Sequence, residues 1–334
     1  MATSAVVGCG DISVVHLEAI RETAGAELVG VCDLDPTSAA GAGHRYEVPA
    51  FTDHRRLLAE LRPDVVHVCT PHDQHAPVAV DSLHAGANVL LEKPLAHTVA
   101  AAEQIAGVAA EHPGSKVGVC FQNRYNTTSR AMRRLLASGA LGDVLGGSAS
   151  VRWRRTPEYY RARPWRGQRA RSGGGVLINQ AIHTLDLLEW LVGDVTAVRG
   201  DVRHDGQHTP AIDVEDTAHL VLQHGSAVQT LFDATTLNVS DEPVTIEIVT
   251  ENAVLHLRGD LTVSYGDGKV ETVQDTPPGE SLGRSYWGTS HRLLIDDFYR
   301  RLPDPTPFWI GPGEALSTMR ILDRVYARIS PPPA

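Results

Sequence analysis

Short apolar runs alternate with helix-length segments through the first third of the chain. Five runs within residues 4–122 are strand-like: SAVVG, AELVGVCD, PDVVHVCTP, ANVLLEKP and KVGVCFQ. Between them lie amphipathic stretches such as SVVHLEAIRETAG, HRRLLAELR, HAPVAVDSLHAG and TVAAAEQIAGVAAEHP. Near-continuous apolar strands separated by helices are typical of a parallel sheet covered on both faces. The pattern predicts an α/β domain with a doubly wound parallel sheet over residues 1–122.

The pattern changes after about residue 123, where longer strands with alternating apolar and polar positions appear. These are VLGGSASVRWR, VEDTAHLVLQH, SAVQTLFDATT, PVTIEIVT, NAVLHLRG and LTVSYG. Helices are expected at 175–192, 287–301 and 313–329. We therefore expect an α+β domain with a large, mostly antiparallel open sheet over 123–312, serving substrate binding and oligomerisation. Residues 313–334 are expected to form a C-terminal helix that packs back on the N-terminal domain.

The first strand runs into Gly8-Cys9-Gly10-Asp11-Ile12-Ser13, and a helix follows. Two glycines allow a tight turn and let a pyrophosphate approach the backbone at the helix N-terminus, as in a Rossmann domain. Ser13 stands where the usual fingerprint has its third glycine, so the match is partial. Glycines at a strand turn that binds no ligand are common, and the pair alone leaves nucleotide binding open.

An acidic residue follows the second strand at a distance that strengthens this prediction. Asp33 lies 23 residues beyond Gly10, where a carboxylate can accept hydrogen bonds from the ribose hydroxyls of the adenosine. The carboxylate repels a 2′-phosphate and no arginine follows directly, so NAD is favoured over NADP as the cofactor. The alternative is that Asp33 only caps the next helix.

The segment GGGVLINQAIHTLDLLEWL, residues 173–191, predicts a helix that begins after a glycine loop. Its buried side is expected to comprise Val176, Leu177, Ile182, Leu185, Leu188 and Leu191. Asn179, His183 and Asp186 are spaced to share the opposite face. Spacing alone favours a solvated helix side over the floor of a cleft.

Composition restricts the remaining classes. The chain has 334 residues, 42% of them hydrophobic, and a net charge of −10, which gives a nucleic-acid partner no electrostatic support. No membrane-length apolar run and no signal-peptide pattern is present, so a cytoplasmic protein without a membrane partner is expected. The four cysteines and 16 histidines show no metal-ligand spacing, so no metal is expected.

Several segments together resemble the Gfo/Idh/MocA oxidoreductase family. They are TPHDQHAPVAVDSLHAGANVLLEKPLA at 70–96, the glycine-led helix at 173–191, VEDTAHLVLQHGSAVQTL at 214–231, SHRLLIDDFYRRL at 290–302 and the closing GEALSTMRILDRVYARI. The resemblance covers nearly the whole chain, and the EKP sequence combined with the helix is its most specific part. It implies a dinucleotide-dependent dehydrogenase or reductase, mainly of sugars and cyclitols.

The resemblance also implies roles for individual residues. Lys93, after a strand and before Pro94, would lie beside the nicotinamide and polarise the reacting hydroxyl, and His183 would be the general base. Alternatively, the proton relay between these two residues would run in the opposite direction. Many relatives carry Asp where this chain has Asn179, which makes myo-inositol a less favoured substrate. The expected cofactor contacts are Gly8, Gly10, Asp11, Ile12, Asp33, Thr70, Pro71, His75, Glu92 and Lys93.

The segment TPEYYRARPWRGQRARSGGG before the helix bears on the substrate. Aromatic faces can stack on a sugar ring and arginine can grip a carboxylate or phosphate, although an oligomer contact would use the same residues. The residues expected to bind substrate are Asn179, Arg124, Tyr160, Trp165, Arg166 and Asp186, with Tyr159 and Arg152 as further candidates.

The segment resembles the subgroup that oxidises the 3-hydroxyl of sugars. The expected function is NAD-dependent oxidation of a secondary hydroxyl, at ring carbon 3, of a sugar, amino sugar or aminoglycoside-type glycoside. The alternatives are a keto-sugar reductase and a noncatalytic nucleotide sensor. A homodimer or homotetramer is expected from the family.

Overall fold

The structure is a computed structural model that describes residues 1–205, 212–225, 227–275 and 290–327. It consists of two compact units. The first comprises residues 1–122 with 278–316, and the second comprises residues 123–277 with 317–334. Each unit is built on one large sheet.

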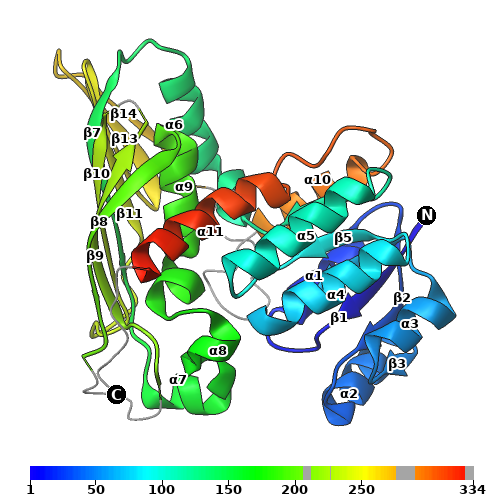
Figure 1. Cartoon of the computed structure of the whole chain (residues 1–334). Helices are drawn as coiled ribbons and strands as arrows, with labels where there is room; N and C mark the ends of the chain where they lie inside the picture. The colour runs from blue at the N-terminus through cyan, green and yellow to red at the C-terminus, as the bar shows by residue number, and fades with distance from the viewer. Residues whose placement is uncertain (206–211, 226, 276–289, 328–334) are drawn as a thin grey trace. The chain divides into compact units, whose positions relative to one another are not determined.

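The sheet of the first unit has six strands in the order β3-β2-β1-β4-β5-β6, all parallel. The strands are β1 (Ala2–Val7), β2 (Ala26–Cys32), β3 (Ala50–Phe51), β4 (Val65–Val68), β5 (Asn88–Leu91) and β6 (Val117–Val119). The helices α1 (Ser13–Glu22), α2 (Pro36–Tyr46), α3 (His54–Leu61), α4 (His75–His84), α5 (Val99–Glu111) and α10 (Ser290–Arg300) belong to the same unit (Figure 1). This order, with β1 between β2 and β4, confirms the doubly wound sheet.

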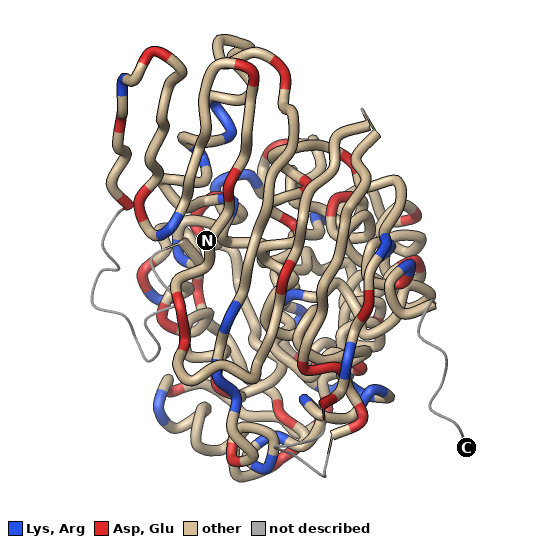
Figure 2. The backbone as a smooth tube through the Cα atoms, turned by 90° about the vertical axis from the view of Figure 1, so that its left-hand side faces the viewer, with Lys and Arg blue, Asp and Glu red and all other residues tan. Residues whose placement is uncertain are grey.

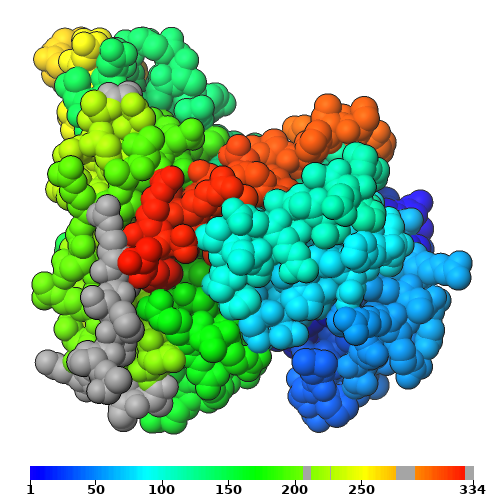
Figure 3. All heavy atoms as spheres, viewed as in Figure 1, coloured from blue at the N-terminus to red at the C-terminus, as the bar shows by residue number. Residues whose placement is uncertain are grey.

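Two elements of this unit escape the sequence pattern. Strand β3 has only two residues, too few for any periodicity. Helix α2 contains AAGAG, and its glycines lower helix propensity. It forms because Asp35 caps its first N–H groups and Pro36 occupies the first turn. Most of its side chains are exposed on the surface of the unit (Figure 3).

The sheet of the second unit has eight strands in the order β14-β13-β12-β11-β7-β10-β9-β8. They are β7 (Val144–Arg152), β8 (Val195–Arg203), β9 (Thr217–His224), β10 (Gln229–Thr235), β11 (Thr245–Thr250), β12 (Ala253–Arg258), β13 (Asp260–Tyr265) and β14 (Val270–Val273). Only the β7–β10 pair is parallel among these described strands. The expected mostly antiparallel sheet is therefore confirmed.

One face of this sheet carries α6 (Thr127–Ala137) and α9 (Ile182–Val192). Within the described residues of the second unit, no helix lies over the opposite face (Figure 1). Seen face on, its strands carry both acidic and basic residues (Figure 2). The alternation along β10, where Phe232 and Ala234 are buried and Leu231 is exposed, follows from the two-residue side-chain period of a strand.

The units differ from the expected domains at the C-terminal end. Helix α10 belongs with the first unit because Thr23 donates to Asp296 at 2.6 Å and Tyr299 contacts His67 at 2.8 Å. Helix α11 (Pro312–Tyr326) was expected to pack on the N-terminal domain, and this packing stays a prediction. Its residues up to 316 belong to the first unit and those from 317 onward to the second. There Ser317 donates to Glu189 at 2.7 Å. Such long-range pairs leave no local signal in the sequence.

The start of the helix expected at 287–301 and the end of the one expected at 313–329 lie outside the described residues. In the described part of the chain, no helix has both the length and the apolar character that crossing a membrane requires.

Candidate functional site

The carboxyl ends of four neighbouring parallel strands meet at one edge of the first unit's sheet. Gly8 follows β1, Asp33 follows β2, Thr70 follows β4 and Lys93 follows β5. In doubly wound sheets this edge, near the point where the strand order reverses, is where ligands bind. The strand order therefore places the predicted cofactor residues of the separate loops together.

The two glycines of the first loop serve different purposes. Gly8 has φ +96°, and a Cβ there would lie 2.6 Å from the carbonyl carbon and oxygen of Cys69, so this glycine is needed by the fold itself. A Cβ on Gly10 would have no atom within 4 Å other than those of Gly10 itself and its two chain neighbours. Gly10 thus leaves open backbone of the kind that a pyrophosphate requires. Asp11 and Ile12 form the turn into α1, and Ser13, at the third glycine position, donates its hydroxyl to the Gly10 carbonyl at 2.6 Å.

Asp33 connects this loop to the second strand. One carboxylate oxygen accepts the Cys9 N–H at 2.7 Å, and the other accepts the Asp35 N–H at 2.8 Å. Each oxygen keeps a second lone pair that can accept a ribose hydroxyl. The helix-capping role belongs to Asp35 instead, which accepts from Thr37 and Ser38. The residues of this edge fit a dinucleotide.

The turn Glu92-Lys93-Pro94 contains a cis Lys93–Pro94 peptide bond. Next to it, His75 lies fully buried with Nδ1 at 2.7 Å from the Pro94 carbonyl and Nε2 at 2.9 Å from the Thr70 carbonyl. Both ring nitrogens thus face main-chain carbonyls, and a neutral imidazole, with one N–H, donates to one of them. The geometry favours His75 as a support of the turn over a direct cofactor contact.

Glu92 was expected to contact the cofactor, but its carboxylate faces the interior. Only 5% of the residue is exposed, and Oε1 lies 3.1 Å from His16 Nε2 and 3.0 Å from His291 Nε2. The expectation of direct contact is therefore corrected, because imidazoles from α1 and α10 surround the carboxylate. The three side chains could serve as metal ligands, but the two contacts have the lengths of N–H···O hydrogen bonds. The absence of a metal stays a prediction.

The loop before α9 needs glycines because other parts of the second unit lie too close to it for a side chain. A Cβ on Gly174 would lie 2.1 Å from Tyr326 Oη, and one on Gly175 would lie 1.8 Å from the Glu215 carbonyl oxygen. Glu215 was missed by the sequence reasoning. Its buried carboxylate accepts the N–H groups of Gly175 at 2.9 Å and Leu177 at 3.1 Å, and so holds the start of the helix. Burial raises the pKa of Glu215 despite these bonds.

The helix after the loop begins with a π-helical turn at Leu177–Ala181, and α9 follows. Turns of this type often occur at functional sites. Asn179 Nδ2 donates to the Gly174 carbonyl at 3.2 Å, and both Asn179 and His183 are partly exposed. The six apolar residues expected on the buried side are all buried.

Asp186 does not serve the predicted polar face. It is fully buried and forms a two-pronged ion pair with Arg124, at 2.9 Å from Nε and 2.7 Å from Nη2. The Arg124 guanidinium also lies over the Trp190 ring, 5.6 Å from its centroid. The predicted substrate contacts of Arg124 and Asp186 are corrected, because both side chains are buried in this ion pair. One helical turn beyond His183, Asp186 instead fixes α9 to the chain before α6.

The aromatic and basic segment before the glycines folds into short helices, α7 (Pro157–Ala162) and α8 (Arg169–Ser172), joined by a 3₁₀ turn. Arg166 lies over Tyr159 at 4.5 Å from the ring centroid and beside Trp165 at 5.8 Å. These three side chains form a partly exposed stack. Tyr160, in contrast, is a core residue against Ile212 and Val214, so its predicted substrate contact is corrected. Burial raises the pKa of Tyr160 to about 12.

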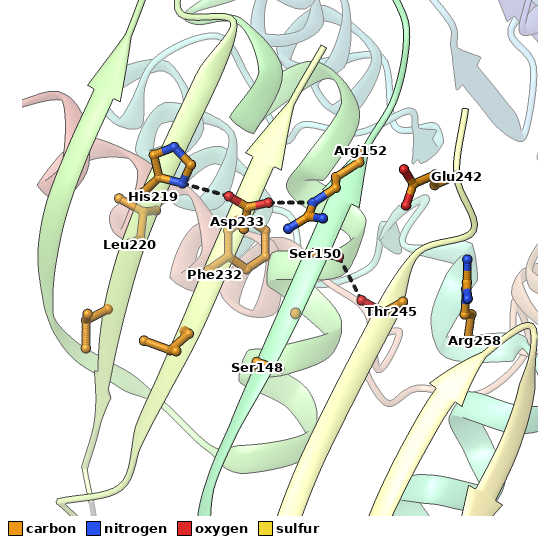
Figure 4. Close-up of a pocket in the computed structure, with 13 residues that line it drawn as sticks. Ser148, Ser150, Arg152, His219, Leu220, Phe232, Asp233, Glu242, Thr245 and Arg258 are labelled. Atoms are coloured by element: carbon orange, nitrogen blue, oxygen red, sulfur yellow. Dashed lines mark hydrogen bonds and ion pairs between the residues drawn. The ribbon is translucent and has the colours of Figure 1, made fainter. Parts of the chain in front are cut away.

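A shallow pocket lies on the helix-free face of the second unit's sheet (Figure 4). There Asp233 accepts from Arg152 at 2.9 Å and contacts His219 at 2.7 Å. Neither Lys93 nor His183 lines it. Arg152, which the sequence suggested for the substrate site, therefore belongs to this face of the sheet.

Comparisons with known proteins agree with the geometry. Residues 3–121 match the model of the oxidoreductase family with an NAD-binding Rossmann fold, and residues 129–256 match the GFO/IDH/MocA C-terminal domain. Fold and matches together define a dinucleotide-binding oxidoreductase. The chain belongs to the Gfo/Idh/MocA family.

Relatives within the family act on different carbohydrates. D-apiose dehydrogenase of Paraburkholderia graminis is 30% identical over 69% of this chain and 59% of its own length. Inositol 2-dehydrogenase 2 of Saccharopolyspora erythraea is 29% identical over 90% of this chain and 80% of its own. The crystal structure of the WlbA dehydrogenase of Bordetella pertussis, in complex with NADH and UDP-GlcNAcA, is 27% identical with a TM-score of 0.84, covering 98% of this chain and 95% of that one.

Proposed function

We propose that the protein is an NAD-dependent dehydrogenase that oxidises a secondary hydroxyl of a sugar, amino sugar or aminoglycoside-type glycoside at ring carbon 3. The observation that carries the proposal is Lys93. It follows β5 at the same sheet edge as Gly10 and Asp33, where a dinucleotide fits. A sensor that only bound the dinucleotide would need the glycines and Asp33 but no lysine there.

Each candidate catalytic residue has a definite task. The Lys93 ammonium donates a hydrogen bond to the hydroxyl oxygen and stabilises its alkoxide character. The His183 imidazole accepts the hydroxyl proton, because histidine ordinarily titrates near neutral pH. The alternative order, in which Lys93 takes the proton and His183 donates, uses the same two groups. NAD, when bound, accepts the hydride from the carbinol carbon.

The proposed substrate class rests on the aromatic stack and on Asn179. Trp165 is a partly exposed aromatic residue of the kind that packs on a sugar ring, and Arg166, which lies over Tyr159, supplies a cation for a carboxylate or phosphate. Asn179 offers an amide to a substrate hydroxyl but no charge. D-apiose dehydrogenase and the WlbA complex support a carbohydrate substrate.

The proposal is tested by following the near-ultraviolet absorbance of reduced nicotinamide. Purified protein is mixed with NAD, or in parallel with NADP, and with separate pools of free sugars, amino sugars, nucleotide-sugars, inositols and aminoglycosides. A rise with a carbohydrate pool other than the inositols is the expected result. A rise only with NADP would overturn the assignment of NAD. A flat trace in every pool while NAD binds would favour a keto-sugar reductase or a nucleotide sensor, and oxidation of NADH by a keto-sugar would identify the reductase.

We further propose that two copies of the chain associate through the helix-free sheet face. Leu231 on this face is 59% exposed, and it lies beside the Arg152–Asp233–His219 network, which offers charges of both signs. A twofold contact places such a patch against itself. Leu231→Glu should lower the mass measured by light scattering, whereas Val239→Glu at a loop position should not. An unchanged mass, or a monomeric parent protein, would contradict the proposed contact.

A further inference from the structure

Three elements of the first unit converge on the Glu92 carboxylate. Glu92 follows β5, His16 lies on α1 and His291 lies on α10. Both imidazole Nε2 atoms contact the same oxygen, Oε1, at 3.1 and 3.0 Å. The exposed fractions of the side chains are 7%, 0% and 2%, so water contributes little to holding the carboxylate. The cluster is a hydrogen-bonded group in the interior of the unit.

The contacts define the charge of the cluster. An ionised carboxylate only accepts hydrogen bonds, so one oxygen can take both imidazole N–H donors. Burial opposes the charge of Glu92, but the hydrogen bonds from His16 and His291 outweigh it and hold its pKa well below the usual range. Glu92 therefore keeps a full negative charge in the interior.

A chain of hydrogen bonds behind His16 agrees with this charge. His16 Nδ1 lies 2.8 Å from His67 Nδ1, His67 Nε2 lies 2.8 Å from Tyr299 Oη, and Tyr299 Oη lies 2.6 Å from Ser4 Oγ. Burial lowers the pKa of both His16 and His67, which keeps the imidazoles neutral. If His16 donates its Nε2 proton to Glu92, its Nδ1 can accept from His67 Nδ1–H, and His67 Nε2 can accept from the Tyr299 hydroxyl. Every contact then joins one donor to one acceptor.

Apart from His291 and Lys93, the other titratable groups that face Glu92 add no positive charge beside it. The Cys69 and Cys120 thiols, after β4 and β6, interact with Glu92, and burial raises the pKa of both well above the usual range. His75 on α4 interacts with both Glu92 and Lys93, and burial lowers its pKa. These thiols and the imidazoles of His16, His67 and His75 are therefore neutral above pH 7.5.

Lys93 is the next residue along the chain, and it contacts this carboxylate directly. Its backbone N–H donates to Glu92 Oε2 at 3.2 Å. The carboxylate thus fixes the main chain from which the Lys93 side chain extends. In a medium of low dielectric constant, the charge of a neighbouring carboxylate stabilises an ammonium.

We propose that His16 and His291 are positioning residues that hold an ionised Glu92 behind Lys93, and that this fixed charge keeps the Lys93 ammonium protonated while it polarises the substrate hydroxyl. The inference rests on the proposed role of Lys93 in the reaction. It assigns a purpose to three buried ionisable groups that the hydride transfer itself does not use.

The test exploits the presence of only three lysines in the chain, Lys93, Lys116 and Lys269. Reductive methylation with ¹³C-formaldehyde labels accessible lysines, and the NMR signal missing from Lys93→Arg identifies Lys93. Its titration is then followed from pH 7.5 to 11.5 without any turnover. Glu92→Gln keeps the shape of the side chain but removes its charge, and its Nε2 group would face the Lys93 N–H in place of Oε2.

The expected result is that the pKa of Lys93 falls by about one unit or more in Glu92→Gln. Glu189→Gln, which neutralises a buried carboxylate of the second unit held by Ser317 and Thr318, should leave it unchanged. His291→Gln retains an N–H donor and the Glu92 charge, so it should also leave the Lys93 titration in place. An unshifted titration in Glu92→Gln would overturn the proposal.

If Glu92→Gln does not fold, ¹⁵N-histidine spectra of the unaltered protein decide. The proposal expects the proton of His16 on Nε2 and that of His67 on Nδ1, with His67→Gln used for assignment. The opposite tautomers would overturn it. None of these readouts depends on activity. A failure to oxidise any sugar would refute the proposed function, while the charge cluster would still be tested by the titration and the histidine spectra.

Discussion

Lys93 carries the central chemical claim at the level of single residues. Its ammonium is proposed to stabilise charge that develops on the substrate oxygen, whereas cofactor binding depends on Gly10 and Asp33. Lys93→Ala should therefore lower kcat by about 10²–10⁴-fold and change the dissociation constant of NADH, measured by fluorescence, by less than about threefold. Lys269→Ala, which removes an exposed lysine, is the matched control. If Lys93→Ala weakened NADH binding by a factor as large as its fall in kcat, the main role of the lysine would be to bind the cofactor.

His183 is expected to set the pH dependence of the reaction. A general base must be deprotonated to act, so activity should rise through the range in which the imidazole titrates, ordinarily near pH 6.5. His183→Ala should lower kcat and remove this rising limb from the profile of kcat against pH. His256→Ala changes an exposed histidine of β12 and should preserve the profile. A limb that survives in His183→Ala would place the base at another residue.

Not every residue role could be read from the sequence. The spacing of Gly8, Gly10 and Asp33 predicted a dinucleotide at this sheet edge, whereas the place of Lys93 beside the nicotinamide followed only from the family resemblance. Arg124, Tyr160 and Asp186 were assigned to substrate because the sequence shows polarity but not burial. Glu215 was missed because its role depends on an approach to Gly175 across 40 positions of the chain.

In the loop after β1, Gly8 and Gly10 are required for different reasons. Gly8 is required by its positive φ and by the backbone after β4, whereas Gly10 faces open space. Gly10→Ala should fold with unchanged thermal stability but weaken NAD binding at least tenfold, because the methyl group occupies the path of the pyrophosphate. Gly8→Ala should instead lower the melting temperature. Calorimetry with and without NAD measures both effects, and equal destabilisation of the two variants would refute the distinction.

At the element level, periodicity predicted most of the long strands and several amphipathic helices. It did not predict β3, α2, the strands β8 and β14, helix α6 or the π turn at Leu177–Ala181. The first is too short for a pattern, and the second depends on capping by Asp35. The π turn adds one residue to the helical repeat. Asn179, placed on one face with His183 by a 3.6-residue count, is therefore displaced from the position that the count gives.

Across the whole molecule, buried histidines should make stability depend on pH. Burial lowers the pKa of His16, His67 and His75 in the folded chain. Below the unfolded value, near 6.5, the unfolded chain binds protons that the folded chain does not, so stability falls as pH falls. These three groups alone contribute up to about 4 kcal/mol per pH unit to the slope.

The measurement is the urea midpoint of unfolding between pH 7.5 and 5.5. The midpoint should fall steeply below pH 6.5, and His67→Gln should make the fall shallower by removing one of the three groups. A midpoint that is constant over this range would contradict the assignment of these histidines as buried and neutral. Glu92 does not contribute to this change, because its depressed pKa moves its own effect to more acidic solution.

The most direct test of the whole account follows the hydrogen that is transferred. The sugar selected by the absorbance screen is prepared with deuterium at ring carbon 3 alone and incubated with the protein and NAD. The account predicts reduced cofactor one mass unit heavier than with unlabelled sugar, together with the 3-keto product. Reduced cofactor without deuterium would show that another carbon is oxidised, and no reduced cofactor from any sugar would contradict the dehydrogenase itself.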